Sequence, residues 1–282
     1  MLNVCDLHTH STFSDGTYTP SEIIQEADRI GLAAVALCDH NSVAGVPAFL
    51  EAAKTAAVEA VPGIEISVDY MGAELHILAL YIPTDALLLY TEYVGQARKN
   101  KEISNRELIA SLNRAGYSLD YDEILKKSPS GGFNRVHVAA ELLARGYISS
   151  IDEGFSTILS PEAGHYKPPA RLDAFETVRF IRSTGAVAVL AHPFLNLSEN
   201  ELRSFLRQAV PCGLVGMEVL YSKYGAEETA RSFAIAEEFN LLPSGGSDFH
   251  GENKKDLLLG VGYGALAIPY SFAEQLKTVS RD

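Results

Sequence analysis

Residues 20–41 read PSEIIQEADRIGLAAVALCDHN, and this stretch decides the fold class. Its first half has the apolar spacing of a helix over 20–30, and Gly31 marks the end of that helix. Residues 32–38 are a continuous apolar run, which is typical of a parallel strand buried on both faces. The polar residues 39–41 follow at once. The stretch therefore predicts a helix that leads into a buried strand, with polar groups at the carboxyl end of the strand.

The same alternation extends to both sides of this stretch. Strands are expected at 2–8, 32–38, 58–66, 75–81, 186–191 and 214–220. Residues 241–245 lead into the motif SDFH, and a last apolar stretch lies at 257–268. Helices are expected at 20–30, 45–58, 173–184, 199–210 and 226–239. Such alternation favours an α/β barrel or a doubly wound sheet, and in both folds sites gather at the carboxyl ends of the strands.

The middle of the chain differs because strand signals nearly vanish there. Residues 86–115 predict one long helix or two, and 134–145 predict a helix between Asn134 and Gly146. Residues 160–171 form a loop rich in proline and glycine. We interpret 85–171 as a helical insert domain that selects the substrate. The barrel domain is then made of 1–84 and 172–282.

Composition narrows the classes of function. The 282 residues carry a formal net charge of -13, which disfavours binding to long nucleic acid. A small phosphorylated substrate suits this charge better, provided that bound cations supply positive charge. The sequence shows no signal peptide and no long apolar span, so we expect a cytoplasmic protein without membrane contact, and we predict no protein partner. Cys5, Cys38 and Cys212 lack metal-ligand spacing and are expected to be reduced thiols.

Histidines and carboxylates recur near the expected strand ends, often with neighbours of the same kind. His8 and His10 are two residues apart, so in an extended chain both rings point to one face, and the DxH pair near the C-terminus repeats this spacing. Each feature alone has a plainer interpretation, such as a surface histidine pair, a turn aspartate or a core histidine. Their joint occurrence predicts a metal centre. The candidate ligands are His8, His10, Asp15, His40, Glu65, His76, His192, Asp248 and His250. Nitrogen and carboxylate ligands without thiolates suit manganese, iron, zinc or magnesium.

The motifs DLHTHSTFSDGTYTP, CDHNSVAG, PGIEIS, LHILALYI, AHP and GGSDFH together resemble the PHP (polymerase and histidinol phosphatase) superfamily. The resemblance implies a distorted (β/α)7 barrel and a centre of two or three divalent ions. By motif, His8, His10, Glu65 and Asp248 would hold one ion. Glu65, His76 and His192 would hold a second, and Asp15, His40 and His250 a third. The implied reaction is phosphomonoester hydrolysis by a metal-activated water, without a covalent protein intermediate.

The insert segment NRVHVAAELLARGYI resembles one subgroup of that superfamily, although Val136 stands where the subgroup has proline. This subgroup acts on nucleoside 3′,5′-bisphosphates and on 5′ ends of short RNA. We therefore expect Arg135, His137 and Lys167 to contact substrate. Asp6 and Asp39 are candidates for orienting neighbouring imidazoles, and Asp39 is equally a candidate helix cap. Two alternatives stay open, namely a histidinol-phosphate phosphatase and a non-catalytic metal-binding module.

Overall fold

The computed structural model describes residues 3–127 and 133–280. Its sheet has the strand order β8-β7-β6-β4-β3-β2-β1-β9, with β5 paired to β3. The strands are β1 (Val4–Thr9), β2 (Ala34–Leu37), β3 (Glu59–Tyr70), β4 (Ala73–Leu80), β5 (Leu172–Asp173), β6 (Val187–Leu190), β7 (Gly216–Tyr221), β8 (Leu242–Gly246) and β9 (Ile268–Pro269). Past the end of β8 the chain returns to β1, where Asp248 N donates to His8 O and His10 N donates to Phe249 O, both at 2.9 Å. The sheet is therefore a nearly closed barrel, which confirms the predicted mixed α/β barrel.

The barrel is distorted because β3 and β4 form an antiparallel hairpin and β4 also runs antiparallel to β6. The sequence predicted two shorter strands at 58–66 and 75–81. Instead β3 continues to Tyr70, and the chain reverses at Met71 and Gly72, both of which have positive φ. A tight turn replaces the crossover helix of a regular strand–helix repeat, so these two strands must be antiparallel.

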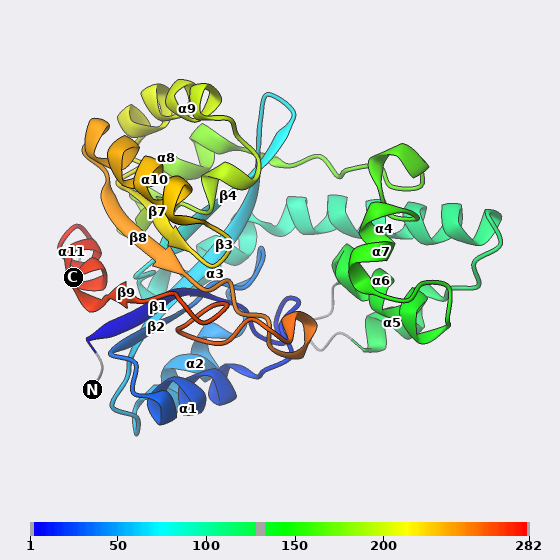
Figure 1. The fold of residues 1–282 in the computed structure, drawn as a ribbon, viewed down its shortest axis with the longest axis horizontal. Coiled ribbons are helices and arrows are strands. Elements are labelled where there is room, and N and C mark those ends of the chain that lie inside the picture. Colours follow the sequence, from blue (N-terminus) through cyan, green and yellow to red (C-terminus); the bar gives the residue numbers. More distant parts are fainter. Residues whose placement is uncertain (1–2, 128–132, 281–282) are drawn as a thin grey trace.

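Helices cover the outer face of the barrel, as Figure 1 shows. These are α1 (Pro20–Ile30), α2 (Val46–Ala53), α8 (Ala174–Ser183), α9 (Glu199–Cys212), α10 (Ala226–Glu238) and α11 (Tyr270–Thr278). The predicted bounds of α1 are confirmed. Thr19 and Glu22 form a reciprocal capping box at its start, and Gly31 ends it in a left-handed conformation.

The helices of the middle region project to one side of the barrel (right in Figure 1). They are α4 (Gly95–Arg114), α5 (Tyr121–Lys126), α6 (Arg135–Ala144) and α7 (Ile151–Ser156), and α3 (Leu87–Tyr93) precedes them. The helices α4–α7 have a hydrophobic core of their own around Leu108, Leu112 and Leu142. In contrast, α3 packs on the barrel core through Tyr90. The division into domains at residues 84 and 171 stays a prediction.

Several local expectations differ from the structure. The helix expected over 45–58 ends at Ala53, since β3 begins at Glu59. The apolar stretch 257–268 consists mainly of turns, with glycines at positive φ, and α11 follows it. The three cysteines are free. Within the described part of the chain, no helix combines the length and the hydropathy that a membrane crossing requires.

Candidate metal centre

The carboxyl-end region of the barrel brings all nine candidate ligands into one cluster. His8 lies in β1 and His10 directly after it, while Glu65 and His76 lie in β3 and β4. The others follow strands: His40 after β2, His192 after β6, and Asp248 and His250 after β8. Ion-pair distances of 3.9 Å or less link every member to at least one other. Strand ends far apart in sequence meet here because the sheet closes on itself.

Glu65 is the centre of this cluster, and it is fully buried. Its Oε1 lies 2.7 Å from His76 Nδ1, 3.0 Å from His192 Nε2 and 3.4 Å from His8 Nε2. Its Oε2 lies 2.8 Å from His40 Nδ1 and 3.4 Å from His10 Nε2. One carboxylate thus faces five imidazoles, an arrangement suited to a group that bridges two cations.

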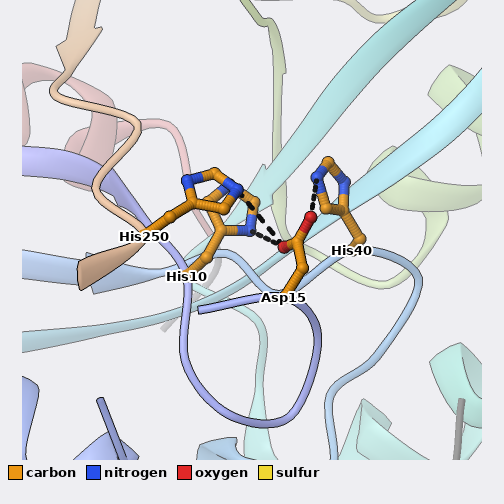
Figure 2. A group of neighbouring side chains, drawn as sticks. All are labelled: His10, Asp15, His40 and His250. Atoms are coloured by element: carbon orange, nitrogen blue, oxygen red, sulfur yellow. Dashed lines mark ion pairs between the residues drawn. The ribbon is translucent and has the colours of Figure 1, made fainter. Parts of the chain in front are cut away.

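Asp15 faces three imidazoles, of which His10 and His40 also face Glu65 and His250 is new, as Figure 2 shows for Asp15. Asp15 Oδ1 lies 3.2 Å from His250 Nε2 and 3.9 Å from His10 Nδ1, and Oδ2 lies 3.7 Å from His40 Nε2. Asp15 comes from the loop after β1, whereas His40 and His250 follow β2 and β8. The loop therefore closes one side of the cluster with a carboxylate.

The residues fit divalent metal ions. Three groups bring their donor atoms within 4.8 Å of one another: His10–Asp15–His40–His250, His8–His10–Glu65, and His40–Glu65–His76. These three groups overlap with the ligand groups that the family resemblance implies. They differ in that His10 and His40 each belong to two of the observed groups, and His192 and Asp248 belong to none of them. Among the described residues, buried atoms of five members have no partner with hydrogen-bond geometry: His8 Nε2, His10 Nδ1 and Nε2, Asp15 Oδ1, Glu65 Oε2 and His76 Nδ1. A buried polar atom without a hydrogen-bond partner lowers the stability of the fold unless a bound ligand contacts it.

Charges within the cluster are strongly coupled. Burial by itself would raise the pKa of Glu65, but His76, His40 and His8 outweigh it and hold the pKa well below the usual range. Burial likewise lowers the pKa of His76, yet Glu65 outweighs this effect and raises that pKa to about 10. Burial lowers the pKa of His10, and the neighbouring His250 lowers it further. The carboxylate is thus an anion, and the His10 ring is neutral with a lone pair free for a metal.

The backbone at two candidate ligands is strained. His192 has φ 25° and Asp248 has φ 58°, and neither residue is glycine. The His192 backbone N donates to Glu218 Oε2 at 2.6 Å, and Asp248 Oδ2 accepts from Tyr221 at 2.9 Å and from Lys254 at 2.8 Å. Such outliers persist where surrounding contacts hold them, and they are frequent at functional sites.

The aspartates expected to orient imidazoles contact other groups. Asp6 accepts from the backbone N of Ser247 and Gly260, each at 2.9 Å. Asp39 accepts from Ser11 N and Oγ and from Ser14 Oγ at 2.6–2.8 Å. The helix cap considered for Asp39 is not observed either, since α2 begins after Gly45. Both aspartates therefore hold the loops that carry the candidate ligands.

Glu218 is a site residue that sequence reasoning missed. It lies in β7 and is fully buried, and its Oε1 is 2.9 Å from His8 Nδ1. The signal was present in the run LVGMEVL, where a single carboxylate stands among apolar residues, as Glu65 does in its own strand. Glu65 lies in the motif PGIEIS, whereas Glu218 lies outside the motifs that carry the family resemblance.

A cleft between the cluster and the insert has a volume of about 290 Å³, and Asp15, His40 and His76 line it. The insert contributes Arg135, whose guanidinium lies 4.1 Å from the centre of the Tyr166 ring. Lys101 in α4 also lines the cleft and donates to Asn134 Oδ1, while Asn134 Nδ2 donates to Asp15 Oδ2 at 2.7 Å. An insert residue thus contacts a candidate metal ligand directly.

The other two insert residues expected to contact substrate lie elsewhere. The Lys167 side chain is 80% exposed, lies 4.0 Å from Glu107, and does not line the cleft. The structure therefore does not place Lys167 at the cleft, and its contact with substrate stays a prediction. His137 Nδ1 accepts from Asn134 N at 3.1 Å, which makes it part of the start of α6 rather than of the cleft wall.

Comparison with known proteins adds independent information. A model of the PHP domain matches residues 6–145. A Haemophilus influenzae protein named 5′-3′ exoribonuclease is 30% identical, over 89% of this chain and 91% of its own. An Eggerthella lenta phosphoribosyl 1,2-cyclic phosphate 1,2-diphosphodiesterase is 30% identical over 88% and 94%. A Chromobacterium violaceum 3′,5′-nucleoside bisphosphate phosphatase is 29% identical, over 91% of each chain.

Solved structures agree with these relatives. A Bifidobacterium adolescentis protein proposed to be a metal-dependent phosphoesterase superposes with a TM-score of 0.86 and 26% identity. The superposition covers 99% of this chain and 96% of that one. Sequence similarity over nearly the whole length, the shared fold and the His/Asp/Glu cluster lead to one conclusion: the chain belongs to the PHP family of metal-dependent phosphoesterases.

Proposed function

We propose that the protein hydrolyses the phosphate ester of nucleoside 3′,5′-bisphosphates or of the 5′ end of short RNA. The observation that carries this proposal is the pairing of a cluster suited to metal ions with cationic side chains from the insert across one cleft. Relatives of similar identity bear the names of an exoribonuclease and of a nucleoside bisphosphate phosphatase. Both names refer to nucleotide substrates. Which of the two substrates this protein prefers is tested by the screen described below.

In this proposal the nine clustered residues hold two or three divalent ions, which are manganese, iron, zinc or magnesium. Such ions, when bound, lower the pKa of water and stabilise negative charge on a phosphoryl group. Glu65 would offer both of its oxygens to these ions, because the two oxygens face different imidazoles at 2.7–3.4 Å. Asp15 and the rings around it provide the remaining carboxylate and imidazole ligands.

The remaining residues of the cleft position the substrate. The Arg135 guanidinium lies over the Tyr166 ring, and no carboxylate oxygen of the described residues lies within 4.0 Å of it, so it can offer paired N–H groups to a second phosphate. Arg171 is less available because it pairs with Glu74 at 2.6 Å. Glu218 and Asn134 hold His8 and Asp15 in place, and no side chain is required as a covalent nucleophile.

A phosphate-release and nucleotide-release screen tests the proposal. Protein loaded separately with manganese, iron, zinc or magnesium is assayed with adenosine 3′,5′-bisphosphate, AMP, histidinol phosphate and a 5′-phosphorylated RNA tetramer. We expect the bisphosphate or the RNA to be turned over fastest, and we expect chelator and the Glu65→Gln variant to abolish turnover. Preference for histidinol phosphate would contradict the substrate class. Metal binding without turnover of any of the four would favour a binding module.

A further inference from the structure

A second cavity lies beside the cleft and has a volume of about 160 Å³. It shares His40, Asn41, Lys101, Asn105 and Asn134 with the cleft, so the two cavities adjoin one another next to the metal centre. We call it the lateral cavity, and its other walls come from Phe13, Ser14, Ser42, Arg98, Lys99, Glu102, Tyr121 and Phe133. Sites that enclose a whole small ligand are about 300–1,000 Å³. The lateral cavity therefore suits one part of a ligand whose remainder lies in the cleft.

Positive charge gathers at the lateral cavity in a chain whose formal net charge is -13. Arg98, Lys99 and Lys101 come from the first two turns of α4. Among residues 3–127 and 133–280, no carboxylate oxygen lies within 4.0 Å of their charged nitrogens. Glu102, the only carboxylate among the described residues that line this cavity, pairs with Arg106 at 2.9 Å. The three cations are therefore available to an anion from outside the protein.

Lys101 connects the lateral cavity with the cleft. It is half-buried, it lines both cavities, and its ammonium donates to the side-chain oxygen of Asn134. A cation withdrawn from water without a carboxylate partner costs free energy, which a bound phosphate offsets. The Asn134 amide in turn donates to Asp15, so Lys101 is one residue removed from a candidate metal ligand. A phosphate at Lys101 would lie between the metal centre and the lateral cavity.

Aromatic rings line the same cavity. Phe13 and Tyr121 are half-buried, whereas Phe133 is almost completely buried behind them. Tyr121 packs against Phe133 with ring centres 4.9 Å apart, and the Arg106 guanidinium lies 3.9 Å from the centre of the Tyr121 ring. Sites that bind single-stranded nucleic acid combine aromatic rings, on which bases stack, with cations that contact the phosphates. The lateral cavity has both kinds of side chain.

From this combination we propose that the lateral cavity binds the second nucleotide of a short 5′-phosphorylated RNA. The phosphate that joins it to the first nucleotide lies at Lys101, and the phosphate on its 3′ side, which a bisphosphate lacks, meets Arg98 and Lys99. Its base packs on Phe13 beside Tyr121. The inference rests on the proposed function and narrows its substrate. An oligonucleotide of two or more residues fills both cavities, whereas a nucleoside bisphosphate fills the cleft alone.

The test compares two substrates on three proteins loaded with the most active metal. The substrates are a 5′-phosphorylated RNA tetramer and adenosine 3′,5′-bisphosphate. The proteins are the wild type, the double variant Arg98→Ala/Lys99→Ala, and the control Arg207→Ala, which removes an exposed cation from α9 on the barrel. We expect the double variant to lower the ratio of kcat/KM for RNA to that for bisphosphate by about tenfold or more, mainly through KM. The control should keep the wild-type ratio.

Salt dependence provides a second readout. If two phosphate contacts are lost, the KM of the double variant for the tetramer should rise less steeply with salt than that of the wild type. Equal ratios and equal salt slopes in the wild type and the double variant would overturn the proposal.

Equilibrium binding separates failure of the lateral cavity from failure of the proposed function. A fluorescent phosphorothioate RNA tetramer is titrated into the same three proteins with metal present. Weaker binding to the double variant than to the control supports the lateral cavity even if no substrate is turned over. If both substrates are hydrolysed and the tetramer binds all three proteins equally, the proposed function stands and the lateral cavity is rejected.

Discussion

Glu218 Oε1 lies 2.9 Å from His8 Nδ1, while Glu218 Oε2 accepts a 2.6 Å hydrogen bond from the backbone N of His192. A single buried carboxylate in β7 thus holds a ring from β1 and the strained backbone after β6. With Nδ1–H donating to Glu218, Nε2 is the ring nitrogen of His8 that is left for a metal ion, and it lies 3.4 Å from Glu65 Oε1. Glu218 therefore selects the tautomer of His8 that can bind a metal ion.

Replacing Glu218 by Gln should weaken metal binding by about 10–100-fold. The Gln side chain can still accept from His192, but its amide can place N–H groups opposite His8 and favour the other tautomer. Metal titration monitored by calorimetry gives the affinity directly. Glu59→Gln is the matched control, because Glu59 accepts from Tyr270 and Lys277 away from the cluster. Equal affinities for the two variants would show that Glu218 does not position His8.

The barrel closes where Gly246 approaches β1. A Cβ at Gly246 would lie 2.1 Å from His8 Cβ and 2.8 Å from His8 N. Rotating the His8 side chain cannot relieve this overlap, because the contacts are with the backbone and Cβ of His8. Gly246→Ala should therefore destabilise the fold by about 3 kcal/mol and disturb metal binding, because His8 must shift. Urea unfolding and metal titration measure the two effects. Gly95→Ala is the control, since a Cβ there meets nothing within 4 Å and should leave both quantities near the wild-type values.

Glu141 anchors α6 of the insert and should make stability depend on pH. Its side chain is 6% exposed, it accepts from Arg145 Nε at 2.6 Å and from Lys127, and these partners lower its pKa below the usual value. A carboxyl with a lowered folded pKa contributes stability above its unfolded pKa of about 4.3, and the contribution is lost as pH falls through the folded pKa.

Glu141→Gln should thus cost about 1 kcal/mol at pH 7, with the same cost down to about pH 5. Below about pH 4 the difference from wild type should shrink. The measurement is urea unfolding of both proteins between about pH 3 and pH 7, followed by the fluorescence of the tyrosines in the insert. Glu162→Gln, at an exposed position in the insert, is the control and should show little difference at any pH. A cost that stays constant to pH 3 would argue against this ion pair.

Metal removal should lower the unfolding temperature. An ion that binds only the folded state adds about 2.7 kcal/mol at a concentration of 100 Kd, which corresponds to several degrees for a chain of this size. Differential scanning calorimetry with manganese and with chelator measures the shift. Glu65→Gln removes the carboxylate that faces five imidazoles, so the variant should show a much smaller shift. A wild type with the same transition under both conditions would contradict a metal centre at this cluster.

The local structure of much of the barrel could be predicted because its signals are local. The helix over 20–30 follows from apolar spacing and from caps at both ends, and those contacts span three or four residues. The buried strand that follows is apolar on every position because it is covered on both faces. The antiparallel pairing of β3 and β4 was not predicted. Two apolar runs in a sequence do not indicate whether a tight turn or a crossover helix connects the strands.

The sequence by itself determined which side chains are available: imidazoles and carboxylates placed within strands or just beyond their ends, and a helical region without strands. Only the tertiary structure decided that Glu65 faces five rings, that Glu218 joins them, and that Asn134 and Lys101 reach the cluster from the insert while Lys167 does not. The physical reason is that these distances depend on how the sheet closes and how the insert docks. Both depend on packing between segments that lie up to 210 residues apart, and no local pattern encodes them.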